Sequence, residues 1–206
     1  MMPVLAVFAS LAVGGADPVD VAIERYRAVG SYRVTLRSSY GESSDVIRYS
    51  YKKPGFVRMD FVQPHKGAVL IYSPLTRKVR LWPFGTGLFS LSLSPDNPLV
   101  QSPTGQRVDR SDIGALLDNV KALQRNGESA VLGEEIVAGK KTLRIAVTGK
   151  GRPATGNVQR YDLWLDSITL LPLKVVSRDA RGDVIETVLM DDLDINVELG
   201  NELFDP

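Results

Sequence analysis

Apolar and polar residues alternate along most of this chain, which is the period of half-buried β-strands. The alternation is clearest in residues 45–82, where four short runs are separated by turn residues. In the first run Ile47, Tyr49 and Tyr51 fall on one face, and polar or charged residues fall on the other. Turns with proline and glycine, such as residues 53–55, join consecutive runs at hairpin distance. The stretch therefore predicts a four-stranded antiparallel meander.

The same alternation extends the predicted sheet on both sides of this meander. Residues 32–37 predict a strand before it, and further runs follow in the second half of the chain at 134–137, 143–147, 161–166, 173–178, 184–190 and 193–197. A sheet of about ten antiparallel strands has to curl, and its connectivity allows it to half-close. The predicted fold class is therefore mainly β (α+β), a single curved antiparallel sheet that forms a half-open β-barrel.

Two segments carry the helical period instead. The first begins after the N-cap candidate Asp17 and ends before Gly30. The second begins after the N-cap candidate Ser111 and ends at Gly127, with an apolar face that contains Ile113, Leu116, Leu117, Val120 and Leu123. These periods predict two amphipathic helices that cover the sheet.

Residues 83–110 join the meander to the second helix and differ from both. They contain four prolines, yet they are also rich in leucine and phenylalanine. A loop of this length in a compact domain is usually functional or disordered, and so many apolar side chains need cover. We expect a lid or flap over the sheet, and the alternative is a loop that packs on the outer surface.

The N-terminus predicts export. Residues 3–13 form an apolar run that ends in the small residues 14–16, as in a secretory signal peptide. We therefore expect a signal peptide over residues 1–16 and a single domain over 17–206. No Lys or Arg precedes the run, so a buried N-terminal strand is the alternative. No apolar run approaches the length that spans a bilayer, which predicts a soluble protein in the periplasm.

Composition and motifs argue against catalysis and metal binding. The 206 residues include one histidine, His65, and no cysteine, and the formal net charge is +1. This excludes a Cys/His metal site and the basic footprint of a nucleic-acid-binding protein. The acidic run at residues 191–194 lacks the glycine and the distal glutamate of a calcium loop. We expect no enzyme, no cofactor and no metal; a hydrolase with dispersed carboxylates is the weakest alternative.

Several motifs resemble those of periplasmic lipoprotein carriers of the LolA type. Residues 53–58, Lys-Pro-Gly-Phe-Val-Arg, are similar to the KPG-x-x-R strand of that family, and residues 67–74 to the strand that follows it. Residues 163–173 and 203–206 resemble the family's C-terminal motifs. Residues 36–38 depart from the family's first strand, which leaves the cargo open between a lipoprotein, a phospholipid and another apolar lipid.

The resemblance implies a carrier that holds acyl chains in a half-barrel under a helical lid. Such a carrier receives a lipoprotein from an inner-membrane donor complex and passes it toward an outer-membrane acceptor. We expect it to act as a monomer without nucleic acid. The alternative is a periplasmic lipid-sensing or lipoprotein-sensing regulatory module of the same fold that binds an anti-sigma-type partner. Such regulators usually carry a second domain after the barrel, and the end of this sequence at Pro206 favours the carrier.

The predicted ligand-binding residues come from the inner face of the sheet, the flap and the second helix. They are Val34, Leu36, Tyr49, Tyr51, Val57, Arg58, Met59, Phe61, Leu88, Phe89, Leu91, Leu116, Leu117 and Val120. In the LolA family the arginine that corresponds to Arg58 contacts the lid and controls its opening. The alternation also permits an outward arginine that pairs with Asp60. The alternative for the whole set is a closed core without a cavity.

Overall fold

The computed structural model describes residues 16–87, 89–150 and 156–205. Within these ranges eleven strands form one sheet in the order β6-β5-β4-β3-β2-β1-β11-β10-β9-β8-β7, and every neighbouring pair is antiparallel. The strands are β1 (Ser31–Tyr40), β2 (Ser43–Lys52), β3 (Phe56–Gln63), β4 (Val69–Ser73), β5 (Lys78–Trp82), β6 (Leu91–Leu93), β7 (Gly127–Val137), β8 (Lys140–Gly149), β9 (Arg160–Asp166), β10 (Pro172–Arg178) and β11 (Val184–Ile195).

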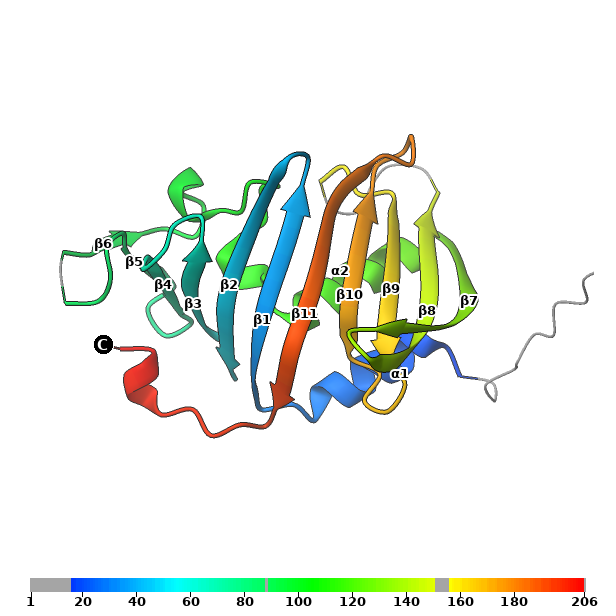
Figure 1. Ribbon diagram of the computed structural model, residues 1–206, viewed down its shortest axis with the longest axis horizontal. Helices are drawn as coiled ribbons and strands as arrows, with labels where there is room; N and C mark the ends of the chain where they lie inside the picture. Colours follow the sequence, from blue (N-terminus) through cyan, green and yellow to red (C-terminus); the bar gives the residue numbers. More distant parts are fainter. Residues whose placement is uncertain (1–15, 88, 151–155, 206) are drawn as a thin grey trace, which may run out of the picture.

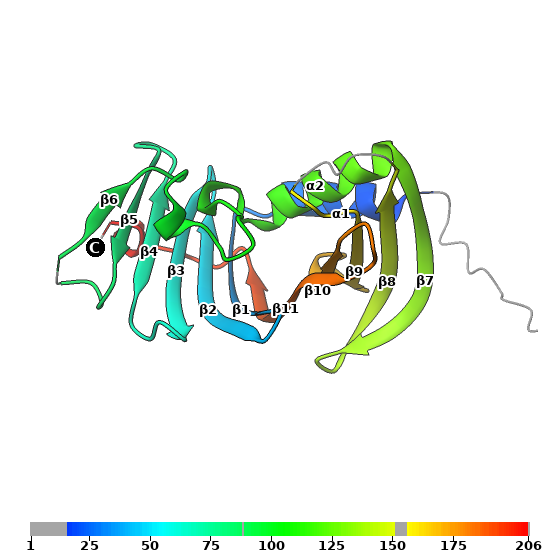
Figure 2. The ribbon, with the colours of Figure 1, turned by 90° about the horizontal axis from the view of Figure 1, so that it is seen from above.

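The sheet is curved and does not close, because β6 and β7 form two free edges (Figure 1). The helices α1 (Pro18–Arg27) and α2 (Ile113–Arg125) lie across its concave side, side by side (Figure 2). The predicted half-open barrel with a helical cover is confirmed. The predicted signal peptide lies outside the described residues except for Ala16.

Asp17 and Asp112 start the two helices. Asp17 Oδ1 accepts a hydrogen bond from Val19 N at 2.8 Å, as predicted. In α2 the prediction of Ser111 as N-cap was wrong by one residue, because Asp112 Oδ1 accepts from Gly114 N at 2.7 Å. Both side chains satisfy amide groups that have no partner within the helix.

Three strand predictions need correction. Residues 184–190 and 193–197 were predicted as two strands, but β11 continues through a bulge in which Asp192 has a φ of 53°. Residues 91–93 form an edge strand that the sequence did not predict. β7 begins at Gly127, where an added Cβ would lie 2.1 Å from the Thr148 carbonyl oxygen. Only glycine lets β7 start so close to β8.

The C-terminal segment, residues 197–204, covers part of the convex face. The segment is red in Figure 1. Its Leu199 and Phe204 pack with side chains of β4 and β5 in a second small core. Arg58 lies in this layer, where its guanidinium donates to both Asp60 carboxylate oxygens and, at 2.9 Å, to the Leu203 carbonyl oxygen. Arg58 therefore lies on the face opposite the helices.

We expect Arg58→Leu to lower the free energy of unfolding by about 1–3 kcal/mol, because it removes charge-assisted hydrogen bonds from a mostly buried site. Ligand release should not change, since Arg58 does not reach the helical cover. Urea unfolding measures the first effect. Arg48→Leu, at an exposed position on the neighbouring strand, is the matched control. Normal stability with altered release would contradict this placement.

Candidate ligand-binding cavity

A cavity of about 1750 Å³ lies between the concave face of the sheet, the two helices and residues 99–111. It is larger than the roughly 300–1,000 Å³ typical of small-molecule pockets. Its walls are mainly apolar, with side chains from the sheet and both helices. These include Ile23, Val34, Leu36, Ile47, Tyr49, Met59, Phe61, Leu70, Leu81, Leu116, Val175, Val188 and Met190.

The structure brings part of the predicted set together at this cavity. The six members that line it are Val34, Leu36, Tyr49, Met59, Phe61 and Leu116. Four others belong to the packed core between the helices and the sheet, namely Tyr51, Val57, Leu117 and Val120. The concave face is therefore partly a filled core and partly a cavity wall, a combination of the two alternatives that the sequence left open.

Of the three ligand-binding residues predicted in the connecting segment, the two that the structure describes do not line the cavity. Leu91 pairs with Leu81 and so extends the sheet at its edge, and Phe89 is 58% exposed. Leu88 lies outside the described residues. Arg58 lies on the convex face and pairs with Asp60, which was the predicted alternative to contact with the lid. A short apolar run looks the same in sequence whether it forms an edge strand or a cover.

The cavity cover on this side is formed by residues 99–111, which overlap the last part of the predicted lid at 83–110 and are called the flap from here on. Val100 and Val108 anchor its two ends in the core, and between them an antiparallel bridge joins Gln101 to Arg107. At the tip of the flap, Thr104 Oγ1 lies 3.4 Å from Glu186 Oε2 on β11. The two buried valines were the sequence signal for this segment.

Buried tyrosines fix the start of α2 above the sheet. The rings of Tyr32 and Tyr49 stack with centroids 5.8 Å apart. The Tyr32 hydroxyl accepts from Ile113 N at 3.1 Å, and Tyr26 donates to Asp112 Oδ1 at 2.8 Å. Burial raises the pKa of Tyr32 well above its ordinary value, so this hydroxyl stays neutral. The cluster positions the helix and has no acid–base role near neutral pH.

Asp112→Ala is expected to lower the free energy of unfolding by about 2 kcal/mol. The change removes the N-cap, worth about 1 kcal/mol, and leaves the Tyr26 hydroxyl without its acceptor. Thermal or urea unfolding measures the loss. Asp118→Ala, at an exposed position of the same helix, should cost much less. Equal losses in both variants would show that Asp112 has no special part in starting α2.

One end of the cavity is polar. Glu186 lines it and accepts hydrogen bonds from Ser38 Oγ and Thr104 Oγ1. Burial raises the pKa of Glu186, its two hydrogen bonds act in the opposite direction, and the nearby Asp45 raises it further. The Asp45 carboxylate accepts from Tyr40 at 3.0 Å. The net result is a carboxyl group whose pKa is above its usual range.

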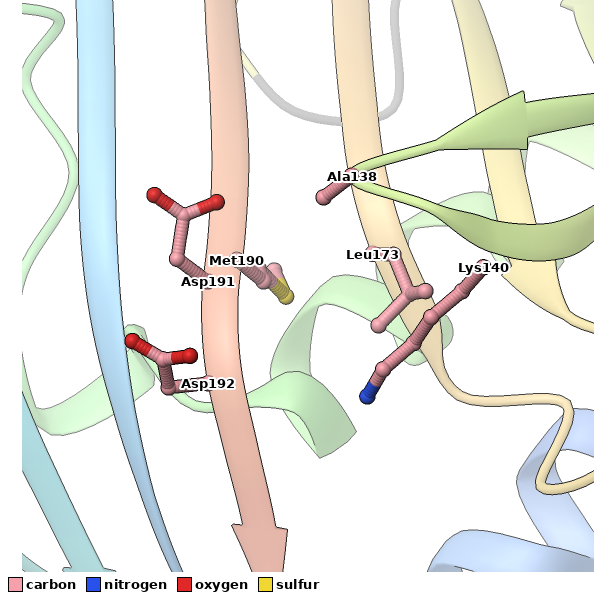
Figure 3. Close-up of a pocket in the computed structure, with 6 residues that line it drawn as sticks. All are labelled: Ala138, Lys140, Leu173, Met190, Asp191 and Asp192. Carbon is pink, nitrogen blue, oxygen red and sulfur yellow. The ribbon is translucent and has the colours of Figure 1, made fainter.

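A smaller pocket lies where β10 and β11 separate. Their pairing ends at Lys174 and Leu189, and beyond it a pocket of about 290 Å³ opens. Figure 3 shows its lining: Ala138, Lys140, Leu173, Met190, Asp191 and Asp192. Met190 lines this pocket and the main cavity, so its side chain lies at the boundary between the two.

The groups that the sequence analysis raised as candidates for chemistry are His65 and the acidic run at residues 191–194. His65 lies at the cavity with its ring 6.3 Å from that of Phe61. In the part of the chain that the structure describes, no three His, Cys, Asp or Glu side chains are grouped so that they would hold a metal. None of the helices in these same residues is long and apolar enough to cross a membrane.

Comparison with solved structures shows the fold. A MucA/MucB complex from Pseudomonas aeruginosa gives a TM-score of 0.53 at 20% identity, over 91% of this chain and 60% of that chain. The lipoprotein LppX from Mycobacterium tuberculosis gives 0.54 at 10% identity, over 89% and 95%. An uncharacterized conserved protein from Thermus thermophilus gives 0.55 at 12% identity, over 92% and 91%. This chain thus spans about 60% of the MucB chain.

Comparison with curated proteins gave no match. A family model for the MucB/RseB N-terminal domain matches residues 94–206, which is more than half of the chain. The matched region includes the flap, α2 and the strands from β7 to β11. The chain belongs to the MucB/RseB N-terminal domain family, and its fold is a half-open barrel with a helical cover.

Proposed function

We propose that this protein binds the acyl chains of a lipoprotein or lipid in the cavity between sheet, helices and flap. The observation that carries the proposal is the size and apolar lining of that cavity. Each methylene group removed from water is worth about 0.8 kcal/mol, so leaving one long acyl chain in water costs on the order of 10 kcal/mol. No chemical change of the ligand is part of the proposal.

The first candidate role for this binding is transport. A periplasmic carrier would take the acyl chains from a donor at the inner membrane and release them toward the outer membrane. The sequence resemblance to LolA-type carriers supports this role, together with a predicted signal peptide over residues 1–16 and one domain over 17–206. An open sheet with a separate cover also suits a ligand that has to enter and leave.

The second candidate role is regulation by a partner protein. The match to the MucB/RseB N-terminal domain favours it, since a solved MucB structure contains a bound MucA. In this role, an acyl ligand in the cavity of this protein would change its affinity for a protein partner. Both roles need the same cavity, and they differ in where the bound ligand goes.

The shared claim is tested by titrating the purified protein with a palmitoyl probe whose fluorescence rises in apolar surroundings. We expect saturable binding near one probe per chain. A linear, non-saturating response would overturn the acyl-binding proposal.

The two candidate roles are then separated by two measurements on the loaded protein. Rapid transfer of the probe to acceptor vesicles supports the carrier, and a ligand-dependent change in capture of an envelope protein supports the regulator.

A further inference from the structure

The concave face changes from apolar to polar at the same end of four neighbouring strands, β2, β1, β11 and β10. Along each strand the residues that line the cavity are apolar or aromatic up to one polar position close to this end. On β1, for example, Leu36 is followed on the same face by Ser38. The polar positions, which we call the polar belt, are Asp45 on β2, Ser38 on β1, Glu186 on β11 and Ser177 on β10.

Strand register brings the belt together. Ser38 is the pairing partner of Asp45, and Ser177 is the pairing partner of Glu186. The hydrogen bond from Ser38 to Glu186 joins the two pairs across β1 and β11. This end of the sheet carries the exposed turns at residues 41–42 and 179–183, at the top of Figure 1. A ligand bound with its chain on the apolar wall would therefore place its polar end at the belt, near solvent.

The belt contains two carboxyl groups and no cationic side chain. Within residues 16–87, 89–150 and 156–205, neither Glu186 nor Asp45 takes part in a salt bridge. Some other charged groups at the cavity are paired, whereas Arg110, Asp118 and Arg125, which also line it, form no ion pair within the described residues. Arg107 is paired with Asp96 and Asp109, and Asp20 is paired with Lys121. The nearby carboxylate of Asp45 raises the pKa of Glu186.

These groups would act selectively on the polar end of a ligand. A carboxylate accepts hydrogen bonds from a hydroxyl, an amide N–H or an ammonium group, and it repels a second anion. The repulsion is strong here because Glu186 is partly buried beside apolar walls, where screening by water is weak. At the belt, an anionic end would face two carboxyl groups, because the arginines and the lysine that line the cavity lie on the flap and the helices.

We propose that Glu186 makes the cavity selective for acyl ligands whose polar end is an uncharged hydrogen-bond donor or an ammonium group. Anionic ends such as a carboxylate or a phosphate are rejected. The inference rests on the proposed acyl binding and narrows its ligand class. The amide of an N-acylated peptide has the favoured chemistry, whereas a free fatty acid does not.

The test compares three ligands that share one chain and differ at the polar end: hexadecylamine, hexadecanol and palmitate. Each displaces a neutral apolar dye from the full protein at neutral pH. We expect the amine and the alcohol to bind at least about tenfold more tightly than palmitate, an effect that a single like-charge contact is sufficient to produce. Glu186→Gln keeps the size of the side chain and should reduce the difference to about threefold or less.

Asp192→Asn is the matched control, because it removes a negative charge from the same strand at an exposed bulge outside the main cavity. It should keep the full discrimination, and Asp45→Asn should weaken it. Equal binding of the three ligands, or unchanged discrimination in a folded Glu186→Gln variant, would overturn the selectivity while leaving acyl binding intact. Failure of all three ligands to displace the dye would overturn both.

Discussion

Replacing Leu36 with tryptophan is expected to lower the affinity for a palmitoyl probe about a hundredfold. Leu36 lies on β1, near the middle of the sheet, and its side chain lines the cavity. An indole at this position would fill space that the acyl chain needs. Loss of contact with about four methylene groups, at about 0.8 kcal/mol each, costs about 3 kcal/mol and accounts for this factor. The measurement is dye displacement at equilibrium.

Thr35→Trp is the matched control for this substitution. Thr35 is the adjacent residue on β1, where successive side chains point to opposite faces, so its indole would lie on the convex side. We expect near-normal affinity in this variant. The unfolding midpoint of Leu36→Trp should stay close to that of the unmodified protein, because the residue borders open space. Normal binding by a folded Leu36→Trp protein would mean that the acyl chain lies elsewhere.

Asp162→Asn is expected to lower the free energy of unfolding by about 3–5 kcal/mol, the range for removal of one partner from a buried ion pair. The side chain of Asp162 is 1% exposed and lies on β9 among three arginines. Arg160 Nη2 is 2.7 Å from its carboxylate, Arg178 Nε is 3.3 Å away, and Arg144 Nη2 is 3.7 Å away. Without the carboxylate, three guanidinium groups face one another. Urea unfolding at neutral pH gives the loss.

The same carboxylate should contribute to acid sensitivity. Burial alone raises the pKa of Asp162, but the hydrogen bonds and charge of Arg160 and its neighbours outweigh this and leave the pKa lowered. Its stabilisation is therefore present above the pKa of the unfolded chain, about 3.9, and is lost as pH falls through the lower folded pKa. Asp162→Asn should lose less stability than the unmodified protein between neutral pH and about pH 3. An equal loss in both proteins would contradict this linkage, and Asp192→Asn is the exposed control.

The faces of the central strands were predictable from the sequence, because side chains alternate with a period of two. Tyr49 and Leu36 lie on the concave side as their alternation indicated. The face on which Arg58 lies was not predictable, because β3 carries apolar residues on both of its faces. Phe56, next to Arg58 on the convex face, packs against Phe204 of the C-terminal segment. A strand covered on both faces loses the contrast between apolar and polar positions that assigns a direction.

No local pattern in the sequence predicted the polar belt. Ser38 and Glu186 are 148 residues apart in the sequence and meet only because β1 pairs with β11 in the middle of the sheet. Individually, each is an ordinary polar residue in an alternating strand. The flap overlaps the predicted lid, but the residues of the lid that face the cavity were not predictable. The flap's anchors Val100 and Val108 are separated by polar residues, and the richer apolar run before them became an exposed edge.

Native mass spectrometry of the protein purified from the envelope fraction of cells that express the full chain tests acyl binding most directly. Organic extraction would identify any bound molecule. We predict close to one acyl-bearing ligand per chain, with a neutral or cationic polar end, and its loss from the Leu36→Trp variant. Protein that carries no ligand and takes up no palmitoyl probe would contradict the proposal, and the cavity would then not be an acyl-chain site.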